Sequence, residues 1–209
     1  MNMIESIKSL FTNKNYMFML ISCVFLYGLN SAIAGVITSF TAPYFYETSD
    51  ISIASLIFMV SGIFNSFFIG TLLDKYQCYR KALIFLSCAS ILTMSTAFFA
   101  LPSKKVGIFA AGMMLIGATL IPVVTVCFSF AAELSYPVPE SYSIGIMISI
   151  SQIFGFLMGL VLSGVASMDG ENGPRYGVAI WVGCATIASV FSFLVKCKKN
   201  ICQIKFSFL

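Results

Sequence analysis

Residues 106–132 read VGIFAAGMMLIGATLIPVVTVCFSFAA, without a single Asp, Glu, Lys or Arg. A bilayer core about 30 Å thick is crossed by about 20 apolar residues in helical form, because lipid offers the backbone no hydrogen-bonding partner. Further stretches of the chain meet the same requirement: 16–40, 51–73, 82–101, 142–166 and 176–195. We therefore predict an all-α, polytopic membrane protein with six transmembrane helices. Its bundle would cover residues 16–197, between a short tail at 1–15 and a basic tail at 198–209.

The composition of the whole chain excludes most other classes of protein. Of its 209 residues, 59% are hydrophobic and 10% are charged, and the mean hydropathy of +0.96 is too apolar for a soluble core. The chain has no His, which is the usual general base and the commonest zinc ligand. We therefore expect no enzyme, no catalytic residue, no metal site and no cofactor. The basic residues are too few and too segregated to bind nucleic acid, so the expected partner is the lipid bilayer.

The distribution of basic residues predicts the orientation of the six spans, because Lys and Arg near span ends are retained in the cytoplasm. Connections on one side, with the two tails, carry Lys8, Lys14, Lys75, Arg80, Lys81, Lys196, Lys198, Lys199 and Lys205. Connections on the other side carry Lys104, Lys105 and Arg175. Both termini should therefore be cytoplasmic. We expect the plasma membrane, with an organelle membrane as the alternative.

The seven cysteines show no spacing typical of a disulfide framework or a metal site. There is no Cys-x-x-Cys, and four of them lie inside predicted spans, so most are expected to be small apolar core residues. Cys197 and Cys202 flank the end of the last span, where reversible acylation is the alternative.

The connection after the second span, residues 70–81, reads GTLLDKYQCYRK. It is similar to a loop pattern of the major facilitator superfamily, in which an acid at a helix end lies against the positive N-terminus of a neighbouring helix and pairs with a base. Asp74, Arg80 and Lys81 would then form a cytoplasmic latch, although Gln77-Cys78-Tyr79 replaces the glycine expected there. The alternative is an ordinary charged loop, since any short cytoplasmic connection collects basic residues.

Two acidic residues flank the connection 133–140, ELSYPVPE, between the fourth and fifth spans. Its two prolines stop a helix and force an extended turn, and Glu140 stands where the next helix begins and can cap it. Glu133 stands at a helix C-terminus, where the helix dipole disfavours an acid. We therefore expect Glu133 to form a salt bridge with Arg80 or Lys81 and so to join the latch, with Glu140 beside it.

Within the spans the only ionisable groups are Tyr and Cys, so no buried acid offers proton coupling, and facilitated or potential-driven movement fits better. Tyr27 and Gln152 lie roughly 15 to 17 Å inside their spans, which is the bilayer midplane. Asn30 shares a helix face with Tyr27, and Gly28 allows a close approach there. Transporters place substrate at the midplane, but Asn and Gln can also simply join helices.

Two further features of the spans are more typical of structure than of substrate binding. Gly155 and Gly159 in the fifth span form a Gly-x-x-x-Gly close-packing pattern, and Pro122 in the fourth span predicts a kink.

Together these segments resemble the feline leukaemia virus subgroup C receptor-like branch of the superfamily, whose members are discussed as heme and choline carriers. The resemblance rests on the following segments: 133–140 and 151–155, SQIFG; 26–30, LYGLN; 73–75, LDK; and 7–15, IKSLFTNKN, which is similar to the family's central cytoplasmic linker. It covers the whole chain as helices seven to twelve of a twelve-helix protein, that is, the C-terminal six-helix half.

The resemblance implies that Tyr27 and Gln152 contribute to a choline site. A tyrosine ring attracts a quaternary ammonium by a cation–π interaction, and a glutamine carbonyl offers a neutral dipole. Asn30 would orient the tyrosine or contact the substrate hydroxyl. Heme is the less expected substrate, because no His is present to ligate iron.

Six helices line only one wall of such a transporter cavity. The chain would therefore act with a second six-helix half, pair with a second copy, or be a fragment or isoform. In the last case it would not transport, and would instead bind and modulate a full-length relative.

Overall fold

The computed structural model describes residues 3–44, 47–103, 105–136, 138–168 and 172–195. In chain order the elements are α1 (Met3–Thr12), α2 (Lys14–Thr41), η1 (Ala42–Tyr44), α3 (Thr48–Tyr76), α4 (Tyr79–Ala100), η2 (Leu101–Ser103), α5 (Val106–Ser135), α6 (Glu140–Ala166) and α7 (Asn172–Leu194). Helices α2 to α7 are the six that are long and apolar enough to cross a membrane. The predicted all-α architecture with six spans is thus confirmed, while the basic tail at 198–209 lies outside the described residues.

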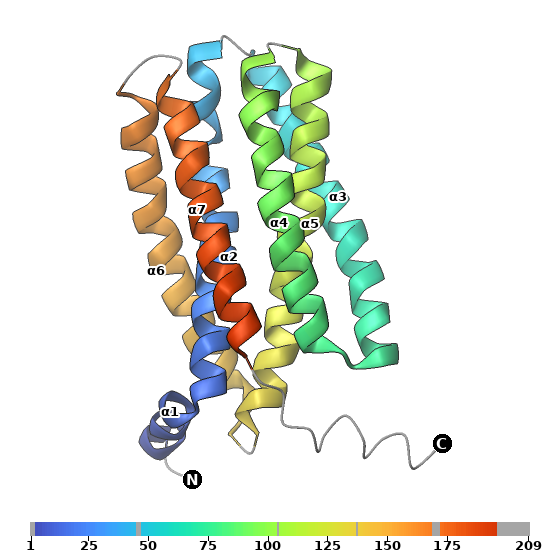
Figure 1. The fold of residues 1–209 in the computed structure, drawn as a ribbon, viewed down its shortest axis with the longest axis vertical. Helices are drawn as coiled ribbons and strands as arrows, with labels where there is room; N and C mark the ends of the chain where they lie inside the picture. The colour runs from blue at the N-terminus through green and yellow to red at the C-terminus, as the bar shows by residue number, and fades with distance from the viewer. Residues whose placement is uncertain (1–2, 45–46, 104, 137, 169–171, 196–209) are drawn as a thin grey trace.

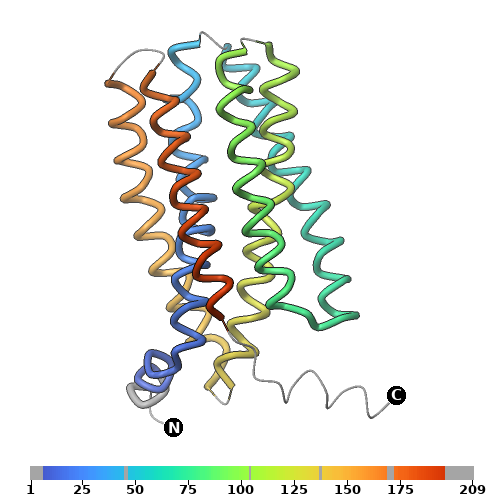
Figure 2. The backbone as a smooth tube through the Cα atoms, in the orientation of Figure 1, coloured from blue at the N-terminus to red at the C-terminus, as the bar shows by residue number. Residues whose placement is uncertain are grey.

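The six long helices run alternately up and down in a single bundle (Figures 1 and 2). Helices α2 and α5 supply much of the buried core. Helix α2 packs against α6 and α7, α5 packs against α3 and α4, and α4 also packs against α7. In Figure 1, α6 and α3 form the two edges of the bundle. We call the end that carries α1 and the end of α7 the α1 end; it corresponds to the predicted cytoplasmic side.

Hydroxyl groups join the helices inside the apolar bundle. Ser22 of α2 lies 2.6 Å from Ser192 of α7 and donates to the carbonyl of Ala188 at 2.9 Å. Between α4 and α5, Thr93 and Thr119 are 2.8 Å apart. Because lipid tails are as apolar as the side chains, the hydrophobic effect adds little here, and such hydrogen bonds and close packing hold membrane helices together.

Two glycines set the crossing of α2 and α6. A Cβ at Gly28 would lie 3.2 Å from the backbone nitrogen of Gly155, and a Cβ at Gly155 would lie 2.8 Å from the carbonyl oxygen of Gly28. Only glycine permits backbones to approach so closely. Gly159, the second glycine of the predicted packing pattern, faces open space, so only half of that pattern forms this contact.

Pro122 lies inside α5, where it lacks the N–H that would bond the carbonyl four residues earlier, that of Ala118. The side-chain amide of Asn65 on α3 donates to that same carbonyl. An unpaired carbonyl is costly inside a bilayer, so Asn65 replaces the bond that the proline removes. This polar residue therefore joins two helices, as expected of many membrane Asn residues.

One disulfide departs from the expectation that the cysteines form no disulfide framework and are mostly small apolar core residues. Cys23 of α2 and Cys127 of α5 are joined, with their Cα atoms 6.1 Å apart. They are 104 positions apart in the chain, and no local spacing motif marks such a pair. Cys78, Cys88 and Cys184 are free, whereas Cys197 and Cys202 lie outside the described residues.

Candidate binding site

The two midplane residues predicted from the sequence lie together. Tyr27 projects from α2 and Gln152 from α6, and the Gln152 side-chain amide donates to the Tyr27 hydroxyl at 3.3 Å. Each residue adjoins the glycine crossing, since Tyr27 precedes Gly28 directly and Gln152 lies three residues before Gly155. The close approach of the two backbones at these glycines therefore brings the two side chains into contact.

A third helix adds an aromatic ring that the sequence did not single out. Phe128 of α5 lies edge-to-face with Tyr27, with ring centroids 6.2 Å apart and ring planes at 87°. Tyr27 and Phe128 are both half-buried, and Gln152 is exposed. Residues from α2, α5 and α6 thus bring together a phenol, a phenyl ring and a carboxamide, and none of them is charged.

Asn30 lies one turn beyond Tyr27 on α2 and is half-buried. Its side-chain oxygen is buried and has no hydrogen-bonding partner within the described part of the chain. A buried amide oxygen usually finds a donor, so this one keeps an unused capacity to accept a hydrogen bond. The side-chain amide of Asn65 bonds to a neighbouring helix, whereas the Asn30 oxygen forms no such bond within the described residues.

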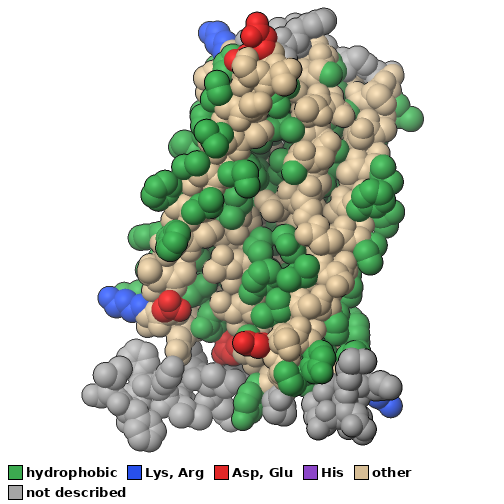
Figure 3. All heavy atoms as spheres, turned by 180° about the vertical axis from the view of Figure 1, so that it is seen from behind, with side chains coloured by type: hydrophobic (Ala, Val, Ile, Leu, Met, Phe, Trp, Pro, Cys, Tyr) green, Lys and Arg blue, Asp and Glu red, His purple; other side chains and the backbone are tan. Residues whose placement is uncertain are grey.

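The three helices that carry the candidate site, α2, α5 and α6, contribute to the face of the bundle opposite α4 and α7. Figure 3 shows this face, where the charged side chains drawn are near the two ends and the middle carries apolar side chains and uncharged atoms. The flanking helices α3 and α6 have few buried residues: three on α3 and six on α6. Large apolar side chains, among them Phe67 on α3 and Phe156 on α6, are largely exposed.

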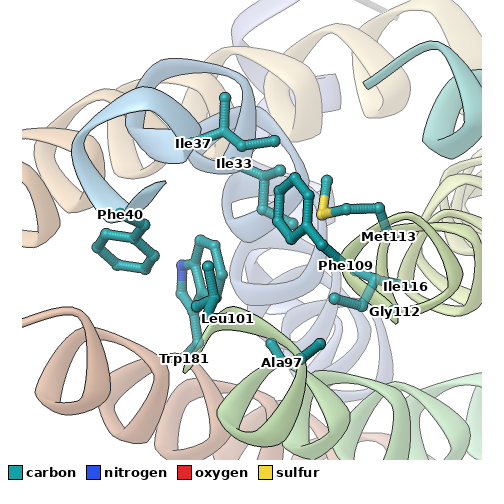
Figure 4. Close-up of a pocket in the computed structure, with 11 residues that line it drawn as sticks. Ile33, Ile37, Phe40, Ala97, Leu101, Phe109, Gly112, Met113, Ile116 and Trp181 are labelled. Atoms are coloured by element: carbon teal, nitrogen blue, oxygen red, sulfur yellow. The ribbon is translucent and has the colours of Figure 1, made fainter. Parts of the chain in front are cut away.

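A separate cavity lies inside the bundle, between residues of α2, α4, α5 and α7 (Figure 4). It has a volume of about 20 Å³ and is lined by apolar residues including Phe40, Phe109 and Trp181. Since drug-sized ligands occupy pockets of roughly 300–1,000 Å³, this cavity is a packing gap. It is also distinct from the three residues of the candidate site.

The predicted latch residues gather near the α1 end without an ion pair between them. Arg80 donates from Nη2 to the carbonyl of Phe193 at 3.3 Å, in the last turn of α7. One carboxylate oxygen of Glu133 and the Nε of Arg80 are buried and have no hydrogen-bonding partner among the residues that the structure describes. Within the described ranges no salt bridge joins Glu133 to Arg80 or Lys81. The latch therefore stays a prediction, and in this structure Arg80 caps a helix end.

The turn between α3 and α4 forms without the glycine that was expected there, because Gln77 takes the left-handed conformation instead. Gln77 has a φ of 49°, in the left-handed region that glycine adopts without strain, and its N–H donates to the carbonyl of Leu73 at 2.7 Å. The turn remains short, because α4 begins at Tyr79. Asp74, Lys81 and Glu140 are exposed around this end of the bundle.

Sequence reasoning did not find Phe128 because it is one of 21 phenylalanines in an apolar span. In the sequence, a polar residue at the midplane differs from its apolar neighbours and can be noticed. A phenylalanine that faces a binding site cannot be distinguished there from a phenylalanine that faces lipid. The only available signal was its position beside Cys127, and the pairing of that cysteine was itself not predictable.

Comparison with known proteins supports the resemblance stated from the sequence. The chain is 24% identical over 200 residues to an uncharacterized MFS-type transporter of Caenorhabditis elegans, covering 91% of this chain and 32% of that protein. It is 24% identical to the choline/ethanolamine transporter FLVCR1 of Felis catus over 181 residues, which is 85% of this chain and 32% of that one. With the choline/ethanolamine transporter FLVCR2 of Rattus norvegicus it shares 24% identity over 80% of its length and 32% of the relative's. No family model matches the chain.

The chain therefore spans about a third of the length of these curated relatives. These relatives are transporters, and none of their names describes an enzyme. Six apolar helices and partial coverage of transporter sequences are consistent with one half of a major facilitator protein.

Proposed function

We propose that this chain is one half of a transporter that moves a small organic cation of the choline or ethanolamine type across a membrane. The proposal is carried by the contact between Tyr27 and Gln152, which joins α2 and α6 on the face with few buried side chains. The names of the curated relatives agree with a substrate of this class.

The chemistry of the three side chains suits such a cation. A quaternary ammonium cannot donate a hydrogen bond, and it is held by the faces of aromatic rings in a site that excludes water. Tyr27 and Phe128 offer two rings at nearly a right angle, which can border a rounded cation on two sides. Gln152 binds the Tyr27 hydroxyl through its amide nitrogen, so its carbonyl oxygen remains for the positive charge.

Asn30 supplies a second kind of contact. Choline and ethanolamine both carry a hydroxyl group, and the unpaired oxygen of Asn30 can accept a hydrogen bond from it. Heme fits these residues poorly, because they offer a neutral aromatic and amide surface and no imidazole ligand for iron.

The second half of the cavity must come from other helices. In major facilitator proteins the substrate lies between two six-helix bundles, and the face with Tyr27 and Gln152 would form one wall. We propose the plasma membrane as the location, with the α1 end in the cytoplasm, and a second six-helix half as the partner.

A second candidate function follows from the same geometry. A chain that supplies one wall could bind a full-length relative and modulate it without transporting. The long exposed apolar faces of α3 and α6 are available for packing against a partner in the membrane, where close packing would have to supply the association because lipid covers apolar side chains equally well.

Uptake of radiolabelled choline tests the two functions. Cells would express the chain alone or with a six-helix N-terminal half taken from a transporter relative, at matched amounts in the membrane. We expect saturable uptake with the second half present. Tyr27→Ala should abolish it, Tyr27→Phe should retain part because the ring remains, and Tyr136→Ala, outside the site, should have no effect.

Choline uptake that is the same for Tyr27→Ala as for the wild type would contradict the proposed site. If the chain copurifies with a full-length relative and changes its uptake, but shows none of its own in any pairing, the modulator function holds instead.

A further inference from the structure

The disulfide between Cys23 and Cys127 ties together the two helices that carry the aromatic rings of the candidate site. Cys23 and Cys127 are 0% and 1% exposed, so the bond lies fully inside the bundle. The side-chain sulfur of Met19 lies 3.4 Å from that of Cys23 and covers it further.

Both ends of the bond adjoin a residue of the site. Cys23 precedes Tyr27 by four positions, one helical turn, so the two side chains share a face of α2. On α5, Cys127 is the direct chain neighbour of Phe128. The bond therefore links α2 to α5 about one helical turn from the place where Tyr27 and Phe128 meet edge-to-face.

The other side-chain hydrogen bonds and the glycine contact of α2 described above lie away from this point, so beside the disulfide α2 and α5 are held by apolar packing. The glycine crossing and the Tyr16 hydroxyl, which donates to the carbonyl of Ser143 at 2.9 Å, hold α2 to α6. A polar link from α2 to α5 lies at the α1 end, where Asn13 donates to the carbonyl of Leu134 at 3.2 Å. At the level of the rings, the disulfide is the covalent constraint on the separation of α2 and α5.

We propose that the Cys23–Cys127 disulfide is a positioning element that sets the geometry of the Tyr27–Phe128 pair for cation binding. This inference rests on the proposed function for its purpose, but its geometric part can be tested without any substrate. Because both sulfurs are buried, the bond is shielded from reagents in solution and acts as a lasting constraint in the folded chain.

The first test asks whether the bond is present in the purified chain. Denatured protein would be treated with iodoacetamide with or without prior reduction and analysed by mass spectrometry. We expect peptides with Cys23 and Cys127 to be alkylated only after reduction, whereas Cys88 and Cys184 react in both cases. Alkylation of Cys23 and Cys127 without reduction would overturn the proposal.

The second test measures the geometry of the site directly. The chain would be labelled with 3-fluorotyrosine, and the ¹⁹F resonance of Tyr27 identified by its loss in Tyr27→Phe. The double variant Cys23→Ala/Cys127→Ala should shift or broaden that resonance, because the ring of Phe128 no longer has a fixed place beside it. Cys184→Ala, at a free cysteine on α7, is the matched control and should leave it unchanged.

If the double variant does not fold, the same resonance would be followed in wild-type protein reduced in detergent until Cys23 becomes alkylatable. An unchanged Tyr27 resonance, in the variant or in reduced protein, would show that the disulfide does not position the ring.

The last test links geometry to binding, measured as choline affinity of the chain with its partner half. We expect the double variant to bind about threefold to tenfold more weakly, a part of what a cation–π contact contributes, with Cys184→Ala unchanged. Unaltered affinity would overturn the role in binding. If wild-type protein binds no choline, the proposed function fails, while the fluorine spectra still decide the positioning role.

Discussion

At the level of single residues, the candidate site works without charge. An acidic side chain at the midplane would attract a cation more strongly, but it would also pay a large desolvation cost and bind any cation that fits. Rings and amides select differently, because they favour a large, weakly hydrated ammonium over a small ion that holds its water. Tyr27, Phe128 and Gln152 are therefore suited to select by size and hydration.

Replacing Phe128 with Leu should weaken choline binding without unfolding the chain. Leucine keeps an apolar side chain of similar volume but removes one aromatic face, which contributes about 0.5 to 2 kcal/mol to a cation–π site. We expect a drop in affinity of about twofold to thirtyfold, measured as the shift in half-saturation of radiolabelled choline uptake.

The matched control is Phe99→Leu. Its ring is 76% exposed and belongs to α4, a helix that contributes no residue to the site. Equal effects of the two substitutions would remove Phe128 from the site.

The polar members of the site could be predicted from the sequence, and the aromatic member could not. Tyr27 and Gln152 are polar residues at the midplane of otherwise apolar spans. Placing a polar side chain there costs free energy, so its presence points to a function or to a contact between helices. Their mutual contact depends on which helices cross at Gly28 and Gly155, and that pairing is a property of the fold. Glu133 and Arg80 show the converse, since their charges favoured a salt bridge that the packing of the helix ends does not form here.

At the level of helices, hydropathy predicted the six spans because each must satisfy its own backbone in lipid. The helices extend past the predicted spans, as α2 does from Lys14 to Thr41, because helical hydrogen bonds continue into the polar region where charges are tolerated. Which helix packs on which is set by small residues and polar side chains at specific positions. Those contacts have no periodic signature in the sequence.

The two glycines of α6 should respond differently to the same substitution. Gly155→Ala places a methyl group 2.8 Å from the carbonyl oxygen of Gly28 and should separate α2 from α6. We expect a loss of about 1 to 3 kcal/mol in the free energy of unfolding, as for other overpacked positions. Unfolding of the purified chain by sodium dodecyl sulfate, followed by circular dichroism, would measure it.

Gly159→Ala, one turn further along α6, meets open space and should change stability by less than about 0.5 kcal/mol. Similar losses for both variants would mean that the crossing does not lie at Gly155.

At the level of the whole molecule, the bundle divides into a packed face and an open face. Helices α4 and α7 pack across α2 and α5 on one side, and α3 and α6 flank the same pair at the edges (Figure 1). Figure 3 shows the open face, on which the charged side chains drawn lie near the two ends and not in the middle. A partner bundle placed there would enclose the site from the other side.

Thiol labelling would test the predicted orientation. Ser49 is exposed at the end opposite α1, and Tyr136 is 86% exposed at the α1 end. A membrane-impermeant maleimide should label Ser49→Cys in intact cells and Tyr136→Cys only after permeabilisation, because the excess of Lys and Arg retains the α1 end in the cytoplasm. Wild-type protein gives the background from native cysteines, and the reverse pattern would invert the topology.

The bond from Asn65 to Ala118 also constrains how the protein is made. Translation runs from the N-terminus, so α3, which holds the donor, enters the bilayer before α5, which holds Pro122 and the carbonyl it leaves free. The Asn65 donor is thus already in the membrane when α5, with its free carbonyl, is inserted. A helix with a free carbonyl that would be costly alone in lipid meets a neighbour that was synthesised earlier, so the order of the helices along the chain becomes part of how the bundle is assembled.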